Sequence, residues 1–232
     1  MLTKVQIDSL AYDPTVTKMM NEDIILATRQ NGAQIRVRDV KQYLIDKDRK
    51  KLASFIYERL YERYIKPFDF LDEEFTKNYK SGFLQMASAC LLIENYASFR
   101  NKGLTDTNRQ SRKCFAYFFT SEKRFKEFSL GGLRPNGELA GSKDGGLPNN
   151  FYDNVRCGIL HNAETKGGWR INRDKTKPLV NLSTKEINAT KFMNRVHSCL
   201  RGYRETLISS NFEHDEVWIA FRSRINHLLK TG

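Results

Sequence analysis

Apolar residues recur at helical spacing along most of this 232-residue chain. Residues 50–65 carry such side chains on one face of a helix: Leu52, Phe55, Ile56, Leu60 and Tyr64. The same spacing marks five later segments, residues 72–100, 112–119, 122–128, 184–207 and 213–229. Side chains that recur about every 3.6 positions form a continuous apolar stripe only on a helix. The sequence therefore predicts an all-α fold.

Two of these segments are rich enough in large apolar residues to supply much of the core. In residues 72–100 we expect burial around much of the helix: Phe83, Met86, Ala87, Cys90, Leu91, Leu92 and Ile93. In residues 112–128 we interpret four aromatic side chains as core rather than as platforms for stacked bases: Phe115, Phe118, Phe119 and Phe125.

The first 46 residues have a mixed pattern. Residues 21–28 suit a short helix or a strand, residues 34–38 alternate like a strand, and residues 40–45 have helical spacing. We therefore expect an N-terminal extension, residues 1–46, and a helical domain, residues 47–232, with one continuous domain as the alternative.

A small β-hairpin is expected in the second half of the chain. Residues 168–183 alternate apolar and polar residues on both sides of the polar run 173–177. Ser183 and Glu186 then have the spacing of a capping box, which predicts a helix from Thr184 to Leu207.

The charge of the chain favours a polyanionic partner. Lys and Arg total 39 against 27 Asp and Glu, a net charge of +12 with a pI near 9.5. Nucleic acid is the commonest polyanion in the cytosol, whereas a generically basic soluble protein is the alternative. No segment suits a membrane span and the N-terminus lacks an apolar signal region, so we expect a cytoplasmic protein without membrane contact.

The sequence predicts no metal site and no cofactor. The four cysteines are widely spaced and form no C-x-x-C pair, and three histidines are isolated from one another: His197, His214 and His227. The glycine-rich residues 131–148 fail the test for a phosphate-binding P-loop, because Ser142 precedes Lys143 where a P-loop has glycine. Arg134 and Lys143 in this loop are candidate contacts for RNA phosphates.

Residues 151–162 carry the most informative chemistry. They predict a helix in which Phe151, Val155 and Ile159 form a core stripe. Arg156 and His161 lie about 140° apart around this helix and outside the stripe. A permanent cation beside a group that exchanges a proton near neutral pH is a minimal apparatus for cleaving a phosphodiester. The two side chains would need a second surface to converge on one ligand.

This R-x4-H pattern resembles the signature of the HEPN superfamily. The helix at residues 87–100 is similar to the one that packs beside the motif in that family. The resemblance implies a HEPN-like helical bundle that dimerises through the motif helix. It also implies a metal-independent endoribonuclease, for which a toxin or phage-defence setting is typical. RNA is then the substrate, and a neutralising or activating protein is a further expected partner.

Carried over by position, the resemblance makes Arg156 and His161 the catalytic pair. In such a reaction the RNA 2′-hydroxyl attacks the adjacent phosphorus, leaving a 2′,3′-cyclic phosphate. Cys157 departs from the Asn, Asp or His often found directly after the Arg. Further candidates for binding or positioning the substrate are Asn154, Cys157, Asn162 and Thr165.

Glu94 lies in an otherwise apolar helix, where a carboxylate needs a partner. Arg156 or Arg100 would satisfy it, and a surface position is the alternative.

Two other functional classes stay open at this point. One is a catalytically silent HEPN-like module that binds RNA or a nucleotide, which the Cys157 departure allows. The other is an all-α interaction module whose basic surface meets an acidic protein partner.

Overall fold

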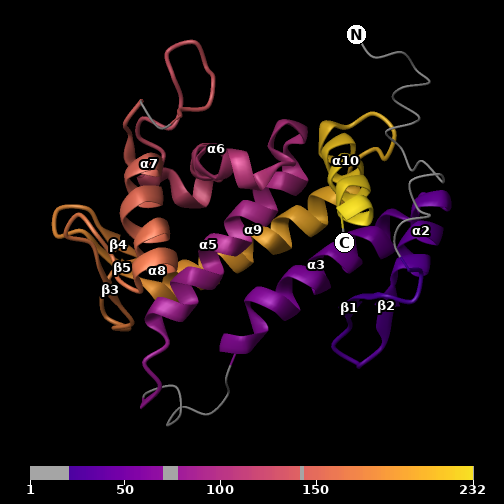
Figure 1. The fold of residues 1–232 in the computed structure, drawn as a ribbon, viewed down its shortest axis with the longest axis horizontal. Helices are drawn as coiled ribbons and strands as arrows, with labels where there is room; N and C mark the ends of the chain where they lie inside the picture. The colour runs from indigo at the N-terminus through magenta and orange to yellow at the C-terminus, as the bar shows by residue number, and fades with distance from the viewer. Residues whose placement is uncertain (1–20, 70–77, 142–143, 232) are drawn as a thin grey trace. The chain divides into compact units, whose positions relative to one another are not determined.

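The computed structural model describes residues 21–69, 78–141 and 144–231 of the chain. These residues are mostly helical, as the sequence predicts, with small sheets beside the helices (Figure 1). The helices are α2 (Val37–Ile45), α3 (Arg49–Tyr64), α5 (Gly82–Arg100), α6 (Thr107–Ser121), α7 (Leu147–Phe151), α8 (Cys157–Asn162), α9 (Ala189–Ser209) and α10 (Glu216–Thr231). The chain divides into two compact units, which are described separately below.

The first unit combines Met1–Arg63 with Ser98–Asp106 and Leu200–Gly232. Its strands β1 (Ile25–Thr28) and β2 (Gln34–Arg36) form an antiparallel hairpin that leads directly into α2. Large aromatic side chains fill its core, and two of them, Trp218 and Tyr203, donate hydrogen bonds to backbone carbonyls. The Trp218 indole donates to the Leu207 carbonyl at 3.0 Å, and the Tyr203 hydroxyl donates to the Phe99 carbonyl at 3.1 Å.

The second unit contains Tyr64–Ala97 and Thr107–Cys199, and with them the R-x4-H motif. Its core is a cluster of phenylalanines from α6, the 3-10 segment η4 (Lys123–Phe128), α7 and α9. Phe115, Phe118, Phe119 and Phe125 are all fully buried, which confirms their predicted core role.

The predicted core is partly wrong in helix α5. Met86, Cys90, Leu92 and Ile93 are buried, as expected, but Phe83 and Leu91 are 41% and 37% exposed. The sequence carries apolar residues around most of this helix, whereas its neighbours in the described structure cover only part of the circumference. The sequence predicts a helix from residue 72. Residues 70–77 lie outside the described residues, and α5 begins at Gly82.

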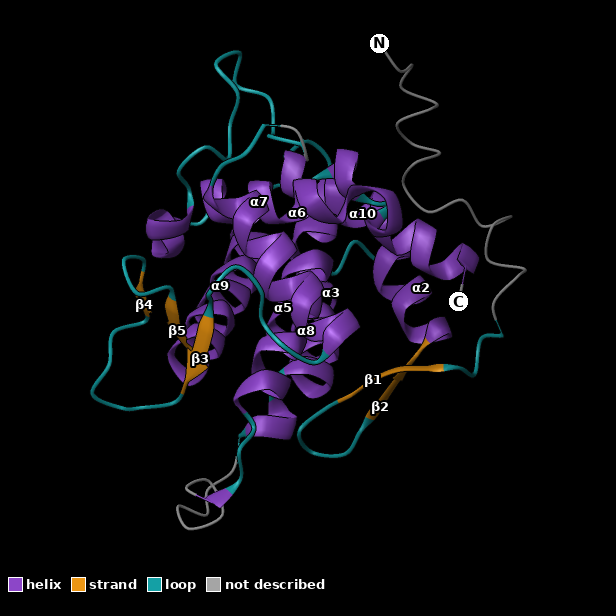
Figure 2. Cartoon of the chain, turned by 60° about the vertical axis from the view of Figure 1, so that its left-hand side comes forward, coloured by secondary structure: helices purple, strands orange, loops and turns teal. Residues whose placement is uncertain are grey.

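The predicted β-hairpin needs a different correction. Strands β3 (Arg170–Asn172) and β4 (Val180–Asn181) form where the alternation predicts them, but they do not pair with each other. A third strand, β5 (Glu186–Asn188), lies between them, parallel to β3 and antiparallel to β4 (Figure 2). The hairpin is therefore β4–β5.

The same strand shortens the predicted helix at residues 184–207. Glu186 belongs to β5, so Ser183 and Glu186 form no capping box, and α9 begins only at Ala189. Asn188 occupies the capping position instead, because its side-chain oxygen accepts the Lys191 backbone N–H at 3.0 Å.

The glycine-rich loop before α7 is closed by backbone contact at its base. A Cβ on Gly146 would lie 2.3 Å from the Gly131 carbonyl oxygen, and both glycines have positive φ angles of 83° and 73°. Only residues without a side chain allow this approach. The base of the loop therefore lies directly before α7, which precedes the motif.

Candidate active site

The motif lies on a helical run that contains a π-helical turn. Helix α7 continues into η5 (Tyr152–Arg156), where the Cys157 N–H donates to the Tyr152 carbonyl, and then into α8. Such i→i+5 turns are rare in proteins, and those that occur are often found at functional sites. The π turn corrects the expectation of one regular α-helix. It leaves the predicted core stripe in place, because Phe151, Val155 and Ile159 are all buried.

Arg156 is held by a carboxylate within the second unit. Its Nε donates to Glu94 Oε1 at 2.8 Å, and the two side chains are only 15% and 9% exposed. The expectation that Arg156 points away from the core is therefore wrong. The physical reason is Glu94, since a buried carboxylate on α5 supplies the counter-charge that a largely buried guanidinium requires. The alternative of a surface position for Glu94 is excluded.

Burial and the partner's charge act in opposite directions on the pKa of each member of this pair. Burial raises the pKa of Glu94 above its usual value, and the hydrogen bond and charge of Arg156 offset only part of that rise. For Arg156, burial acts to lower the pKa, but the hydrogen bond and charge of Glu94 outweigh it and the net pKa is raised. The neighbouring Cys90 is fully buried, and burial raises the pKa of its thiol strongly.

Tyr152 connects Arg156 to a second ion pair. The Arg156 guanidinium lies 5.3 Å from the Tyr152 ring centre and the Arg112 guanidinium lies 4.7 Å from it. Arg112 forms a two-point ion pair with Asp153, with contacts of 2.5 and 2.7 Å. Arg156 and Arg112 are therefore both held in place by a carboxylate and by the same aromatic ring.

A cavity of about 360 Å³ lies beside Tyr152 and has a strongly basic wall. Its lining includes Arg109, Arg112 and Lys113 from α6, together with Ser111 and Gly141. Residues 109, 112 and 113 share one face of a helix because their spacing is i, i+3, i+4. Sequence reasoning missed Tyr152, Ser111 and this basic face as site elements, although the spacing of the three cations was a signal that could have found them.

His161 lies at the other end of α8 in a different environment. Its side chain is exposed, and within the described residues it makes no hydrogen bond or ion pair. The helix ends directly after it, where Ala163 adopts a left-handed conformation with φ 55°. The structure thus brings Arg156 together with Glu94 but leaves His161 open to solvent.

The turn after α8 contains Thr165 and hydrogen-bonds to Asn154 in η5. The Lys166 N–H donates to the Asn154 carbonyl at 2.7 Å, and the Thr165 hydroxyl donates to the Trp169 carbonyl. The turn also approaches α8 closely, since a Cβ on Gly158 would lie 2.5 Å from the Glu164 carbonyl oxygen. Thr165 therefore belongs to the turn after α8, and Asn154 in η5 is joined to that turn through its backbone carbonyl.

The remaining predicted site residues are scattered. Asn162 is exposed and Cys157 is half-buried next to Arg156. Arg134 pairs with Glu138 at 3.2 Å and with Asp144 at 3.0 Å, so its charge is already met within its own loop. Lys143 lies outside the described residues.

The described residues offer neither a cluster of metal ligands nor a membrane-spanning helix. They contain no group of three or more His, Cys, Asp or Glu side chains that could hold a metal ion. No helix in residues 21–69, 78–141 or 144–231 is long and apolar enough to cross a membrane. Comparison of the chain with protein-family models, with curated proteins and with solved structures finds no match.

Proposed function

We propose that this protein is a metal-independent endoribonuclease of the HEPN type. The observation that carries the proposal is the state of Arg156. Its Nε is fixed by Glu94, while the other guanidinium nitrogens make no hydrogen bond within the described residues. A guanidinium with one nitrogen anchored and two free is oriented to bind a phosphate oxygen.

The proposed chemistry divides the work between the two motif residues. Arg156 would stabilise the charge that develops on the non-bridging oxygens of the scissile phosphate. His161 would exchange a proton with the attacking 2′-hydroxyl or the leaving 5′-oxygen, for which an unpaired, exposed imidazole is suited. The products would be a 2′,3′-cyclic phosphate and a 5′-hydroxyl. The cations beside Tyr152 would bind flanking phosphates.

The arrangement supports a site shared by two chains. Arg156 is paired with the buried Glu94 and His161 is exposed near the end of α8, so within one chain the two side chains lie in different environments. Two motif helices packed around a two-fold axis would supply two Arg and two His to one cleft. We therefore propose a homodimer formed through the motif helix.

A second candidate function is favoured by the burial of the Arg156–Glu94 pair. Ion pairs of this kind also serve a purely structural role, and a chain with Cys157 after the Arg would then be a silent RNA-binding module. Basic side chains would supply its RNA affinity without cleavage.

An assay for cleavage of labelled RNA by the purified chain in EDTA distinguishes the nuclease from the silent RNA-binding module. The nuclease is expected to cut all-ribose RNA in chelator and to leave intact a substrate with one 2′-deoxy sugar at the cut site, because the nucleophile is the 2′-hydroxyl. Binding without cleavage under all conditions supports the silent module. Cleavage that chelation abolishes contradicts the metal-independent mechanism.

A further inference from the structure

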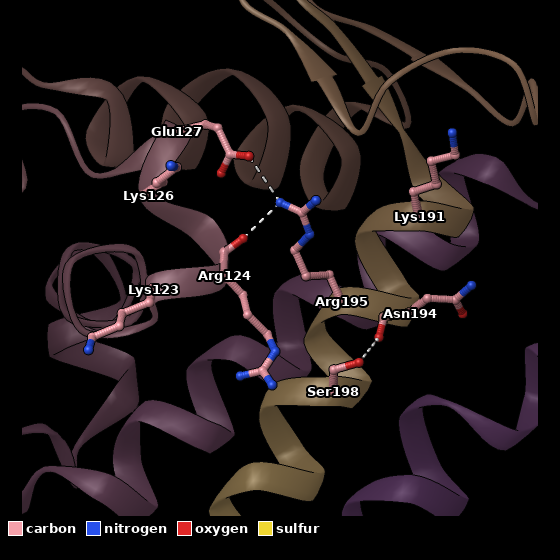
Figure 3. Close-up of a pocket in the computed structure, with 8 residues that line it drawn as sticks. All are labelled: Lys123, Arg124, Lys126, Glu127, Lys191, Asn194, Arg195 and Ser198. Carbon is pink, nitrogen blue, oxygen red and sulfur yellow. Dashed lines mark hydrogen bonds and ion pairs between the residues drawn. The ribbon is translucent and has the colours of Figure 1, made fainter.

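A second basic cavity lies in the second unit, between η4 and α9 (Figure 3). Its volume is about 600 Å³, and five cationic side chains line it: Lys123, Arg124, Lys126, Lys191 and Arg195. One carboxylate, that of Glu127, stands among them. We call this surface the η4–α9 groove.

The sequence places these cations on one surface for a simple reason. In η4, Phe125 and Phe128 are fully buried, which turns the neighbouring polar side chains outward. In α9, Lys191, Arg195 and Ser198 lie on one face because they are four and seven residues apart. The groove is therefore the polar side of two elements whose apolar sides build the phenylalanine core.

Part of the groove is held rigidly. Arg195 Nη1 donates to Glu127 at 3.1 Å and to the Arg124 carbonyl at 2.7 Å, which joins α9 to η4 (Figure 3). The Lys191 ammonium donates to the Lys177 carbonyl, a neutral acceptor, at 2.6 Å. The single carboxylate is thus already used by Arg195.

The other three cations have no counter-charge. Within the described part of the chain, Lys123, Arg124 and Lys126 form no ion pair. Three uncompensated cations on one six-residue segment, facing two more on α9, create a concentrated positive field. An extended anion that contacts all of these cations would offset their mutual repulsion.

We propose that the η4–α9 groove binds the phosphate backbone of RNA. The lining includes no aromatic side chain on which a base could stack, and its cations follow an open surface. Contacts of this composition read phosphates and not base identity. The inference rests on the proposed function for its ligand, because the RNA that the motif would cleave is the strand that the groove would hold.

The test compares two variants with equal loss of charge. The groove variant carries Lys123→Gln, Arg124→Gln and Lys126→Gln. The control variant carries Lys80→Gln, Lys102→Gln and Lys175→Gln, three exposed residues outside the groove that form no ion pair with the described residues. The Kd for a single-stranded RNA with 2′-deoxy sugars at its cut sites is measured over a range of salt concentrations. A nucleoside triphosphate is tested in parallel as the alternative phosphate ligand.

The groove variant is expected to bind at least about tenfold more weakly than wild type at low salt. Its plot of log K against log salt should be shallower by about 2, since each phosphate contact to a single strand contributes about 0.7 to that slope. The control variant should bind within about twofold of wild type. Equal losses in both variants, or binding of the triphosphate alone, overturn the proposal. If the wild-type chain binds RNA through the groove but cleaves none, the RNA-binding proposal for the groove holds and the proposed nuclease activity is wrong.

Discussion

Arg156 Nε donates a 2.8 Å hydrogen bond to Glu94 Oε1, and both side chains are at least 85% shielded from solvent. This pair ties η5 to α5 across the second unit. Truncating one partner leaves the other charge buried, which typically costs several kcal/mol. We therefore expect Arg156→Ala to lower the free energy of unfolding by about 3 kcal/mol in urea denaturation. Loss of activity in this variant would then reflect structure as well as chemistry.

Two further variants test whether the lost stability comes from the unpaired buried charge. Replacing both partners, Arg156→Met with Glu94→Leu, should recover most of the stability because no charge stays buried. Arg112→Ala is the matched control: it breaks the more exposed pair with Asp153 and should cost less than about 1 kcal/mol. A double variant as unstable as the sum of its single variants would show that the pair is not coupled.

The raised pKa of Glu94 gives a dependence of stability on pH with a defined sign. A carboxyl whose pKa is raised by folding binds its proton more tightly in the folded state. Its contribution to stability is fully present below the unfolded value of about 4.5 and is lost as pH rises through the folded pKa. The stability of wild type relative to Glu94→Gln should therefore fall from pH 4.5 upward. Urea denaturation of both proteins between pH 4 and 8 measures this difference, and a rise with pH contradicts it.

His161 offers the cleaner test of catalysis. The side chain is exposed and has no partner in the described structure, so His161→Ala should change stability by less than about 0.5 kcal/mol. Removing an acid–base group should reduce the single-turnover cleavage rate by about 10²- to 10⁴-fold. His214→Ala, which removes another exposed histidine, should cleave at the wild-type rate. A folded His161→Ala protein that cleaves normally excludes the assigned role.

Local periodicity was enough to predict most of the helices but not the features that shape the site. The phenylalanine core and α3 follow directly from apolar spacing, which depends only on near neighbours in the chain. Strand β5 was missed because its pairing with β3 joins residues sixteen positions apart, and Ser183 and Glu186 mimic a helix start. The π turn inserts a wider hydrogen-bonded loop that leaves the apolar pattern unchanged. The partner of Glu94 was predicted from a carboxylate in an otherwise apolar helix, which left Arg156 and Arg100 as alternatives; only the fold, which brings together residues 62 positions apart, selects Arg156.

Gly158 should be essential for the close contact between α8 and the turn that contains Thr165. A Cβ at this position would lie 2.5 Å from the Glu164 carbonyl oxygen, so Gly158→Ala must displace the backbone. We expect a destabilisation of about 1–3 kcal/mol, typical of overpacking. Gly202→Ala in α9 is the control, because a Cβ there meets nothing within 4 Å, and it should be neutral or stabilising by up to about 1 kcal/mol. Equal melting temperatures for the two variants would contradict this account.

The final prediction concerns the proposed homodimer. Leu160 lies between the two motif residues on α8 and is only half-buried within one chain. If two motif helices pack together, Leu160→Asp places a charge in an apolar contact and should weaken dimer and cleavage together. Leu130→Asp, at a loop residue that is 78% exposed, should change neither. Sedimentation velocity at the protein concentration of the cleavage assay provides the measurement. A wild-type chain that is monomeric and fully active at that concentration rules out a site built from two chains.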